Sequence, residues 1–205
     1  KSMRVLIVNG SPHENGCTRG ALEEVASMLI NDGIETEWFW IGMEPVAGCI
    51  ACKHCQSTGR CCKQDLVNEF LDMADTADGF LFGSPVYFAG ITGQLKCFMD
   101  RVFYCGDFSG KPAAAVVSCR RGGASTAYDQ INKYFQIRNM PVVTSQYWNQ
   151  IHGNGNRRSD LLLDQEGLQT MRTLGKNMVW LLRLIESGTI LRQVYEKKIR
   201  TDFHK

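Results

Sequence analysis

The chain has 205 residues, which is enough for about one to one-and-a-half domains with a sizeable core. Its 44% hydrophobic and 21% charged residues are ordinary for a soluble globular protein. The net charge of +2 is too small to favour a nucleic acid or a membrane surface as partner, and no apolar run approaches a membrane span. We therefore expect a single domain over residues 1–205, with a core at 3–187 and a C-terminal tail at 189–205.

The first apolar segment, residues 3–8, is too short for a signal-peptide core and leads into a Gly-Ser-Pro turn. It is typical of a first strand, and we expect the protein to be cytoplasmic. Nine cysteines is a high number, and residence in the cytosol makes a disulfide framework unexpected. Five of them fall between Cys49 and Cys62.

Short apolar runs alternate with amphipathic stretches, a pattern typical of a parallel sheet with crossover helices. Strands are expected at residues 3–9, 34–41, 78–84, 112–119 and 141–148. Helical spacing of apolar residues marks five helices, near residues 22–29, 66–73, 95–102, 131–135 and 168–185. This predicts a doubly wound α/β three-layer sandwich. The polar segment 152–164 is expected to be a mobile loop, and the tail from residue 189 to be either a helical arm or disordered.

Ligands of such sheets bind at the carboxyl ends of the strands. The loop after the first strand, residues 10–18, offers backbone N–H groups, the Ser11 and Thr18 hydroxyls and a helix N-terminus, which together suit a phosphate. It is neither a Walker A loop nor a G-x-G-x-x-G motif. The alternative is a plain strand-to-helix turn.

Two further loops lie at the same edge. In residues 83–93, Pro85 fixes φ, glycines allow close approach, and Tyr87 and Phe88 can face a ring system, although they can also simply cover the sheet edge. In residues 118–125, glycines accompany Arg120, which can stabilise negative charge on a reduced ring, or can belong to a solvated basic turn. The order of the three loops is more specific than any one of them.

Three motifs carry a family resemblance: N-G-S-P-x-x-x-G-x-T at residues 9–18, G-S-P-V-Y-F at 83–88 and G-Q-L-K-x-F-M-D-R at 93–101. Over roughly residues 3–148 the chain resembles the NADPH-dependent FMN reductase family of flavodoxin-like proteins. The resemblance implies a flavodoxin-like five-stranded parallel sheet of order 2-1-3-4-5. It also implies an oxidoreductase that passes a hydride or electrons from NAD(P)H through FMN to an acceptor, assembled as a homodimer or homotetramer.

By the same resemblance, Ser11 and Thr18 hold the FMN phosphate, residues 85–88 line the isoalloxazine, and residues 118–123 close its far side. No side chain is expected to act as a catalytic acid or base, and Tyr87 and Arg120 are the candidates for tuning the flavin. The expected FMN-binding residues are Ser11, His13, Asn15, Gly16, Cys17, Thr18, Pro85, Val86, Tyr87, Phe88, Ser118, Arg120, Gly122 and Gly123.

The spacing C-x2-C-x2-C-x5-C of Cys49, Cys52, Cys55 and Cys61 is similar to the compact motif of iron-sulfur flavoproteins, which bind a [4Fe-4S] cluster beside FMN. His54 and Cys62 can stand in as ligands. A four-thiolate zinc site is an alternative. Free thiols are the third, slightly favoured here because relatives keep cysteines in this segment without a cluster.

Two other classes of function stay open. One is a non-catalytic electron carrier, although the positive charge and the long C-terminal region argue mildly against it. The other is a redox or metal sensor that reports through the cysteine segment.

Overall fold

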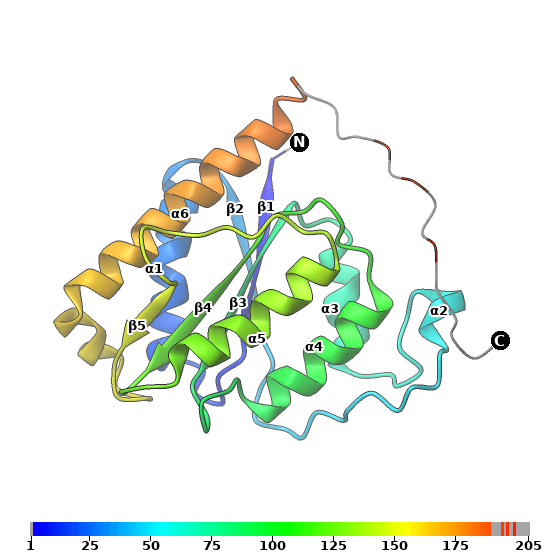
Figure 1. The fold of residues 1–205 in the computed structure, drawn as a ribbon, viewed down its shortest axis with the longest axis horizontal. Coiled ribbons are helices and arrows are strands. Elements are labelled where there is room, and N and C mark those ends of the chain that lie inside the picture. The colour runs from blue at the N-terminus through cyan, green and yellow to red at the C-terminus, as the bar shows by residue number, and fades with distance from the viewer. Residues whose placement is uncertain (1, 190–193, 195, 197–198, 200–205) are drawn as a thin grey trace.

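The computed structural model describes residues 2–189, 194, 196 and 199. Five parallel strands form one sheet in the order β2-β1-β3-β4-β5, which confirms the predicted flavodoxin-like topology (Figure 1). The strands are β1 (Arg4–Asn9), β2 (Glu35–Trp40), β3 (Gly79–Pro85), β4 (Ala113–Cys119) and β5 (Gln150–His152). All seven residues of β4 are buried, as expected of a central parallel strand covered on both faces.

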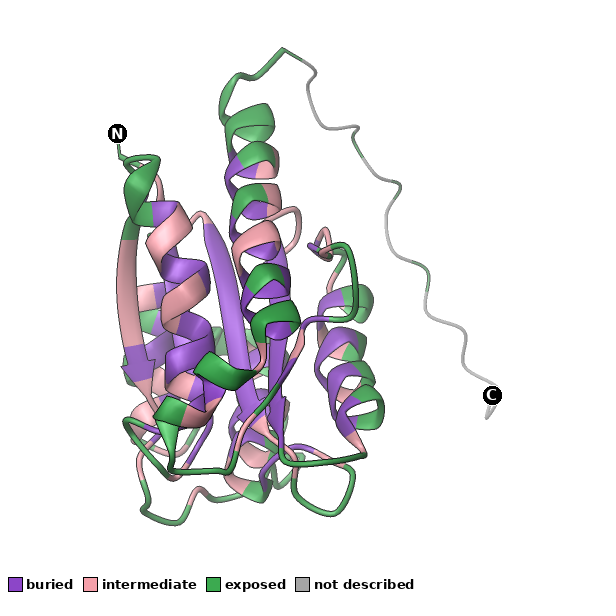
Figure 2. Ribbon diagram, turned by 90° about the vertical axis from the view of Figure 1, so that its left-hand side faces the viewer, coloured by how far each residue is buried: buried purple, intermediate pink, exposed green. Residues whose placement is uncertain are grey.

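Helices cover both faces of the sheet, and Figure 2 shows the strands buried between them. On one face lie α1 (Cys17–Asn31) and α6 (Gln165–Glu186); on the other lie α3 (Leu66–Ala74), α4 (Gly93–Cys105) and α5 (Ala124–Ile137). Alternate residues of β3 serve the two layers, because Phe80 and Phe82 pack towards α3, α4 and α5 while Leu81 packs towards α1 and α6. The short helix α2 (Cys55–Thr58) lies outside this alternation.

The fifth strand differs from the prediction at residues 141–148. Val142 forms only an isolated parallel bridge with Ala113, and β5 begins later, at Gln150. Between the two, the chain leaves the sheet, and the buried Asn149 spans the gap by donating from its side-chain amide to the Val143 carbonyl. The apolar run is therefore a strand in composition, but only part of it joins the ladder.

The segment 152–164, expected to be a loop, contains the end of β5 and a 3-10 helix at Arg158–Leu163. Residues 153–163, called the strap below, pack against α1: the Gly155 carbonyl accepts a hydrogen bond from Cys17 N at 2.8 Å. The predicted tail lies largely outside the described residues. Within the part of the chain that the structure describes, no helix has the length and apolarity needed to cross a membrane.

Candidate functional site: a loop cluster at the sheet edge and a cysteine-lined pocket

The three loops singled out in the sequence meet at the carboxyl edge of the sheet. Val86 N donates to the Ser118 carbonyl at 3.1 Å, and the Thr18 and Ser118 hydroxyl oxygens are 2.8 Å apart. The Thr92 hydroxyl donates to the Gly10 carbonyl at 2.8 Å. The loops after β1, β3 and β4 therefore form one connected surface, as the switch-point rule for open α/β sheets requires.

The loop after β1 is held by the buried side chain of Asn9. Its amide donates to the Glu14 carbonyl at 3.0 Å, and its amide oxygen accepts from Ser11 N at 3.1 Å. The Ser11 hydroxyl in turn accepts from His13 N. No side chain caps the N-terminus of α1, whose N-cap is Gly16. An uncapped terminus of a 15-residue helix beside two hydroxyls is suited to an anionic group such as a phosphate.

The uncapped terminus and the two hydroxyls are called the phosphate cradle below, and Cys17 contacts the strap instead of this cradle. Its backbone N–H is taken by Gly155, its thiol donates to the Arg157 carbonyl at 3.4 Å, and burial together with Asp160 raises the pKa of the thiol. Close contact of the strap also explains Gly16, where a Cβ atom would lie 2.9 Å from the Gly155 carbonyl oxygen. The cradle therefore depends on Ser11, Thr18 and the remaining N–H groups, with the strap sealing one side.

A strained turn follows β3. Tyr87 and Gly90 exchange two backbone hydrogen bonds at 2.8 and 2.9 Å, and the two residues between them, Phe88 and Ala89, have φ of 49° and 59°. Positive φ at both central positions is the requirement of a type I′ turn, and it strains residues other than glycine. The Phe88 side chain is fully exposed and Tyr87 about half exposed. Neither ring is fixed by the core, so both remain on the surface at the candidate ligand edge.

The loop after β4 packs onto this turn through Gly123. Its φ is 89°, and a Cβ atom there would lie 2.9 Å from the Ala89 Cα atom, so the position requires glycine on two counts. Arg120 and Gly122 are exposed. Arg120 also lines a cavity of about 520 Å³ with His152 and Asp164. The guanidinium therefore lies where the loop cluster meets the strap.

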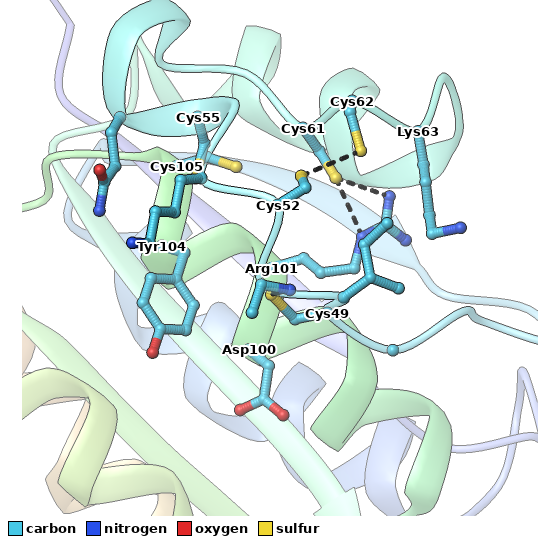
Figure 3. A pocket seen from close by; sticks show the side chains of 15 residues that line it. Cys49, Cys52, Cys55, Cys61, Cys62, Lys63, Asp100, Arg101, Tyr104 and Cys105 are labelled. Atoms are coloured by element: carbon cyan, nitrogen blue, oxygen red, sulfur yellow. Dashed lines mark hydrogen bonds between the residues drawn. The ribbon is translucent and has the colours of Figure 1, made fainter.

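A second site lies at the far end of α4. Its N-cap, Thr92, belongs to the loop cluster, whereas Asp100, Arg101, Tyr104 and Cys105 line a pocket of about 470 Å³ (Figure 3). A 13-residue helix is about 20 Å long. The pocket also holds every cysteine of the segment, namely Cys49, Cys52, Cys55, Cys61 and Cys62. His54, considered as a substitute ligand, is not among the lining residues.

The backbone around these thiols is curled. Ala51 and Lys53 have φ of 54° and 62°, so left-handed residues alternate with Cys52 along the segment. Alternating conformations of this kind turn successive N–H groups inward and form concave anion sites, including those of iron-sulfur clusters. Cys52 Sγ and Cys62 Sγ are 3.4 Å apart. Among the described residues no three His, Cys, Asp or Glu side chains converge on one metal-ion position.

The two metal alternatives require different arrangements of the thiols. Four thiolates at about 2.3 Å from one zinc ion must lie about 3.8 Å from one another. In a [4Fe-4S] cluster each thiolate binds a different iron, so the sulfurs stand farther apart around a larger body. Both sites need several thiols around one space, and six cysteines line this pocket: Cys49, Cys52, Cys55, Cys61, Cys62 and Cys105. Cys105, which sequence spacing did not indicate, is beside Cys55, and burial followed by Cys55 and Cys61 raises its pKa to about 12.

Comparison with known proteins identifies the family of the chain. The family model for NADPH-dependent FMN reductase matches residues 3–154. An iron-sulfur flavoprotein from Methanocaldococcus jannaschii is 36% identical over 195 residues, covering 90% of this chain and 100% of the relative. An iron-sulfur flavoprotein from Methanosarcina thermophila is 30% identical over 195 residues, covering 91% and 98%.

Solved structures agree on the fold. RosB with a bound riboflavin-5'-phosphate derivative superimposes with a TM-score of 0.70 at 13% identity, covering 100% of this chain and 93% of RosB. An NAD(P)H:quinone oxidoreductase from Methanothermobacter marburgensis gives 0.66 at 17% identity, covering 87% and 96%. With its flavodoxin-like sheet, its loop cluster at the carboxyl edge and the family match over residues 3–154, the chain belongs to the NADPH-dependent FMN reductase family of flavin oxidoreductases.

Proposed function

We propose that this flavoprotein takes reducing equivalents from NADH or NADPH and delivers them to an acceptor, with FMN held at the loop cluster. Bound FMN supplies the hydride and electron chemistry, while the protein binds and orients it. The observation that carries the proposal is the junction of the three loops at Thr18, Ser118 and Val86. Membership of the NADPH-dependent FMN reductase family supports NADPH as donor.

The chain's own residues divide the work of binding. The Ser11 and Thr18 hydroxyls and the uncapped N-terminus of α1 hold the phosphate. Tyr87 and Phe88 are positioned at the ring end by the strained turn. Arg120 places a permanent positive charge at the same edge, where it favours an anionic ring. No acid or base is assigned, because hydride transfer to a flavin needs orientation more than proton transfer by a side chain.

We further propose that Cys49, Cys52, Cys55 and Cys61 hold a [4Fe-4S] cluster in the cysteine-lined pocket. The left-handed residues around the thiols, the gathering of thiols in one pocket and the similarity to iron-sulfur flavoproteins support it. Sequence reasoning slightly favoured free thiols, and these three observations reverse that preference. The second function compatible with such a pair of sites is an electron carrier or redox sensor.

The proposal includes a cytoplasmic location and assembly as a homodimer or homotetramer. All nine cysteines are free, which supports a reducing compartment. The exposed Phe88 at the loop cluster supports a neighbouring chain close to the flavin. Size-exclusion chromatography with light scattering tests the assembly, and a monomer would contradict it.

The deciding experiment is anaerobic purification followed by a visible spectrum and by iron and sulfide analysis. We expect flavin bands, a broad iron-sulfur shoulder and about four irons per chain. Addition of NADPH or NADH should bleach the flavin bands. Protein that cannot bind added FMN contradicts the flavoprotein assignment, and FMN binding without iron contradicts only the cluster. A flavin that neither nucleotide reduces identifies an electron carrier instead of a reductase.

A further inference from the structure

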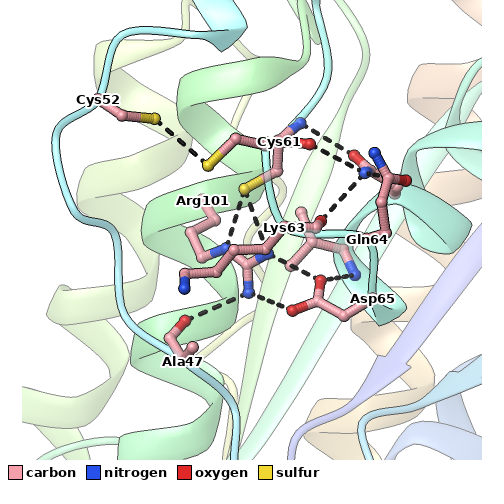
Figure 4. A network of polar contacts seen from close by, with 10 residues as sticks. Ala47, Cys52, Cys61, Lys63, Gln64, Asp65 and Arg101 are labelled. Carbon is pink, nitrogen blue, oxygen red and sulfur yellow. Dashed lines mark hydrogen bonds and ion pairs between the residues drawn. The ribbon is translucent and has the colours of Figure 1, made fainter.

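Arg101 is buried beside the cysteine-lined pocket, with 1% of its side chain exposed. Its Nε and Nη2 atoms each donate to Cys61 Sγ at 3.2 Å, as Figure 4 shows. Its Nη1 and Nη2 atoms donate to the two carboxylate oxygens of Asp65 at 2.8 and 2.7 Å. Nη1 also donates to the Ala47 carbonyl at 3.2 Å. The guanidinium thus donates hydrogen bonds to one sulfur, one carboxylate and one carbonyl.

The two N–H donors on Cys61 Sγ indicate which form of the sulfur this site is suited to. A thiol is a weak acceptor, whereas a thiolate or a metal-bound thiolate is a strong one, so charged N–H donors are better matched to an anionic sulfur. The guanidinium is planar and permanently charged, and its fork fixes the direction of each bond. It therefore fixes the position of Cys61 Sγ as well as its electrostatic surroundings.

Asp65 keeps the arrangement rigid and sets its net charge. Its side chain caps α3 by accepting from Val67 N at 3.2 Å, so the carboxylate is anchored at a helix terminus. The ion pair with Arg101 balances the buried positive charge. The sulfur therefore contacts a cation directly, and the anion that partly offsets this positive charge lies one group farther away.

On the basis of the proposed cluster, we propose that Arg101 is a positioning residue that fixes Cys61 as a ligand and raises the cluster's reduction potential, with Asp65 as its opposing partner. Net charge and hydrogen bonds to the sulfurs set the potentials of such clusters. Donors to a coordinating sulfur withdraw electron density and favour the reduced form. The ligand's outer hydrogen bonds also fix its orientation.

The test is a redox titration of the cluster in three variants of the holoprotein, followed by visible and EPR spectra, with the FMN potential as internal reference. Arg101→Gln removes the charge and should lower the cluster potential. Asp65→Asn keeps an N-cap residue but removes the opposing charge, so it should raise the potential. We expect on the order of a tenfold change in the oxidised-to-reduced ratio in each case, about 59 mV for a one-electron couple.

Arg60→Gln is the matched control, because Arg60 adjoins Cys61 in the sequence but pairs with the exposed Asp72 and Asp75. It should leave the potential unchanged. Opposite shifts in the two test variants support the assignment, since general loosening of the pocket cannot produce both signs. Unchanged potentials, or shifts of the same sign, overturn it.

If the Arg101→Gln variant loses the cluster, the proposal can still be tested. Asp65→Asn then decides alone: a raised potential supports the assignment and a lowered or unchanged one overturns it. Wild-type protein that binds no iron overturns the proposed cluster, and this assignment with it. The two failures are distinguishable by iron content.

Discussion

The hydroxyl oxygens of Thr18 and Ser118 lie 2.8 Å apart, although the two residues are 100 positions apart in the chain. Thr18 lies in the first turn of α1 and Ser118 near the end of β4, and both are almost completely buried. Each hydroxyl therefore fixes the orientation of the other. The loop proposed to hold the FMN phosphate and the loop proposed to close the far side of the ring are therefore linked at one point.

Thr18→Ala should lower the affinity for FMN with the fold intact. A hydrogen bond to a charged group contributes about 1.5–3 kcal/mol, so the dissociation constant should rise by roughly ten- to a hundred-fold. Fluorescence titration of the apoprotein with FMN measures it. Thr18→Ser keeps the hydroxyl and should stay close to wild type. Equal affinities in all three proteins would place the phosphate elsewhere.

One FMN per chain should bind, and FAD should bind poorly. The strap lies against the first turn of α1, with Gly155 O accepting from Cys17 N at 2.8 Å, so we expect it to obstruct a second nucleotide beyond the phosphate. Calorimetric titration with both flavins compares the affinities directly. Comparable affinities would show that the strap does not limit the ligand.

Gly16→Ala should displace the strap and weaken both stability and FMN binding. The added Cβ atom would meet Gly155 O at 2.9 Å and His13 Cβ at 3.0 Å, an overlap expected to cost about 1–3 kcal/mol of unfolding free energy. Gly93→Ala is the control, because nothing lies within 4 Å of its Cβ position. Urea unfolding and FMN titration are the measurements. A Gly16→Ala protein as stable as the control would contradict close packing of the strap.

A serine scan tests which thiols hold iron. Cys49, Cys52, Cys55 and Cys61 should each be required for it, while FMN stays bound in its separate site. Serine at Cys17, Cys97, Cys105 or Cys119 should leave the iron content unchanged. Cys105 is the sharpest comparison, since it lines the same pocket. Iron loss in the Cys105 variant would mean that the ligand set differs from the one that the spacing predicts.

The stability of the protein should fall as the pH rises from about 10 to about 12. Burial, followed by the hydrogen bond that its hydroxyl donates to Asp100, raises the pKa of Tyr134 to about 12, against about 10 in the unfolded chain. In this interval the unfolded state has lost the proton and the folded state retains it, so the unfolding free energy decreases. Tyr134→Phe should flatten that part of the pH profile in urea unfolding. An identical slope in both proteins would assign the alkaline loss to other groups.

Much of the fold was predictable because parallel strands leave a local pattern. The strands β1, β3 and β4 are short apolar runs followed by turn residues, such as Gly83-Ser84-Pro85 at the end of β3. The fifth was misplaced because Val142 and Val143 have the composition of a strand. Whether they join the ladder depends on Asn149 and Ala113, which no local pattern reveals.

The sequence predicts about as much of the candidate site as of the fold. Its loops could be found because glycines, hydroxyls and aromatics gather where strands end. Contacts between distant segments could not be found in this way. The strap reaches α1 through Gly155, and Cys105 reaches the other cysteines only after α4 is folded. Arg101 shows the same limit: its motif was visible, but the sulfur that it binds depends on tertiary structure.

The family match ends at residue 154, yet α6 begins after it. Met171, Leu174, Met178 and Leu182 of that helix are buried against β1, β3 and β4, with at most 2% of each exposed. Burying four such side chains contributes about 6–12 kcal/mol, which is comparable to the whole stability of a typical domain. An expression fragment cut at residue 154, where the family model ends, would thus expose apolar surface of the sheet and of α1, and it should aggregate. For this chain, the end of the family model and the end of the folding unit are different places.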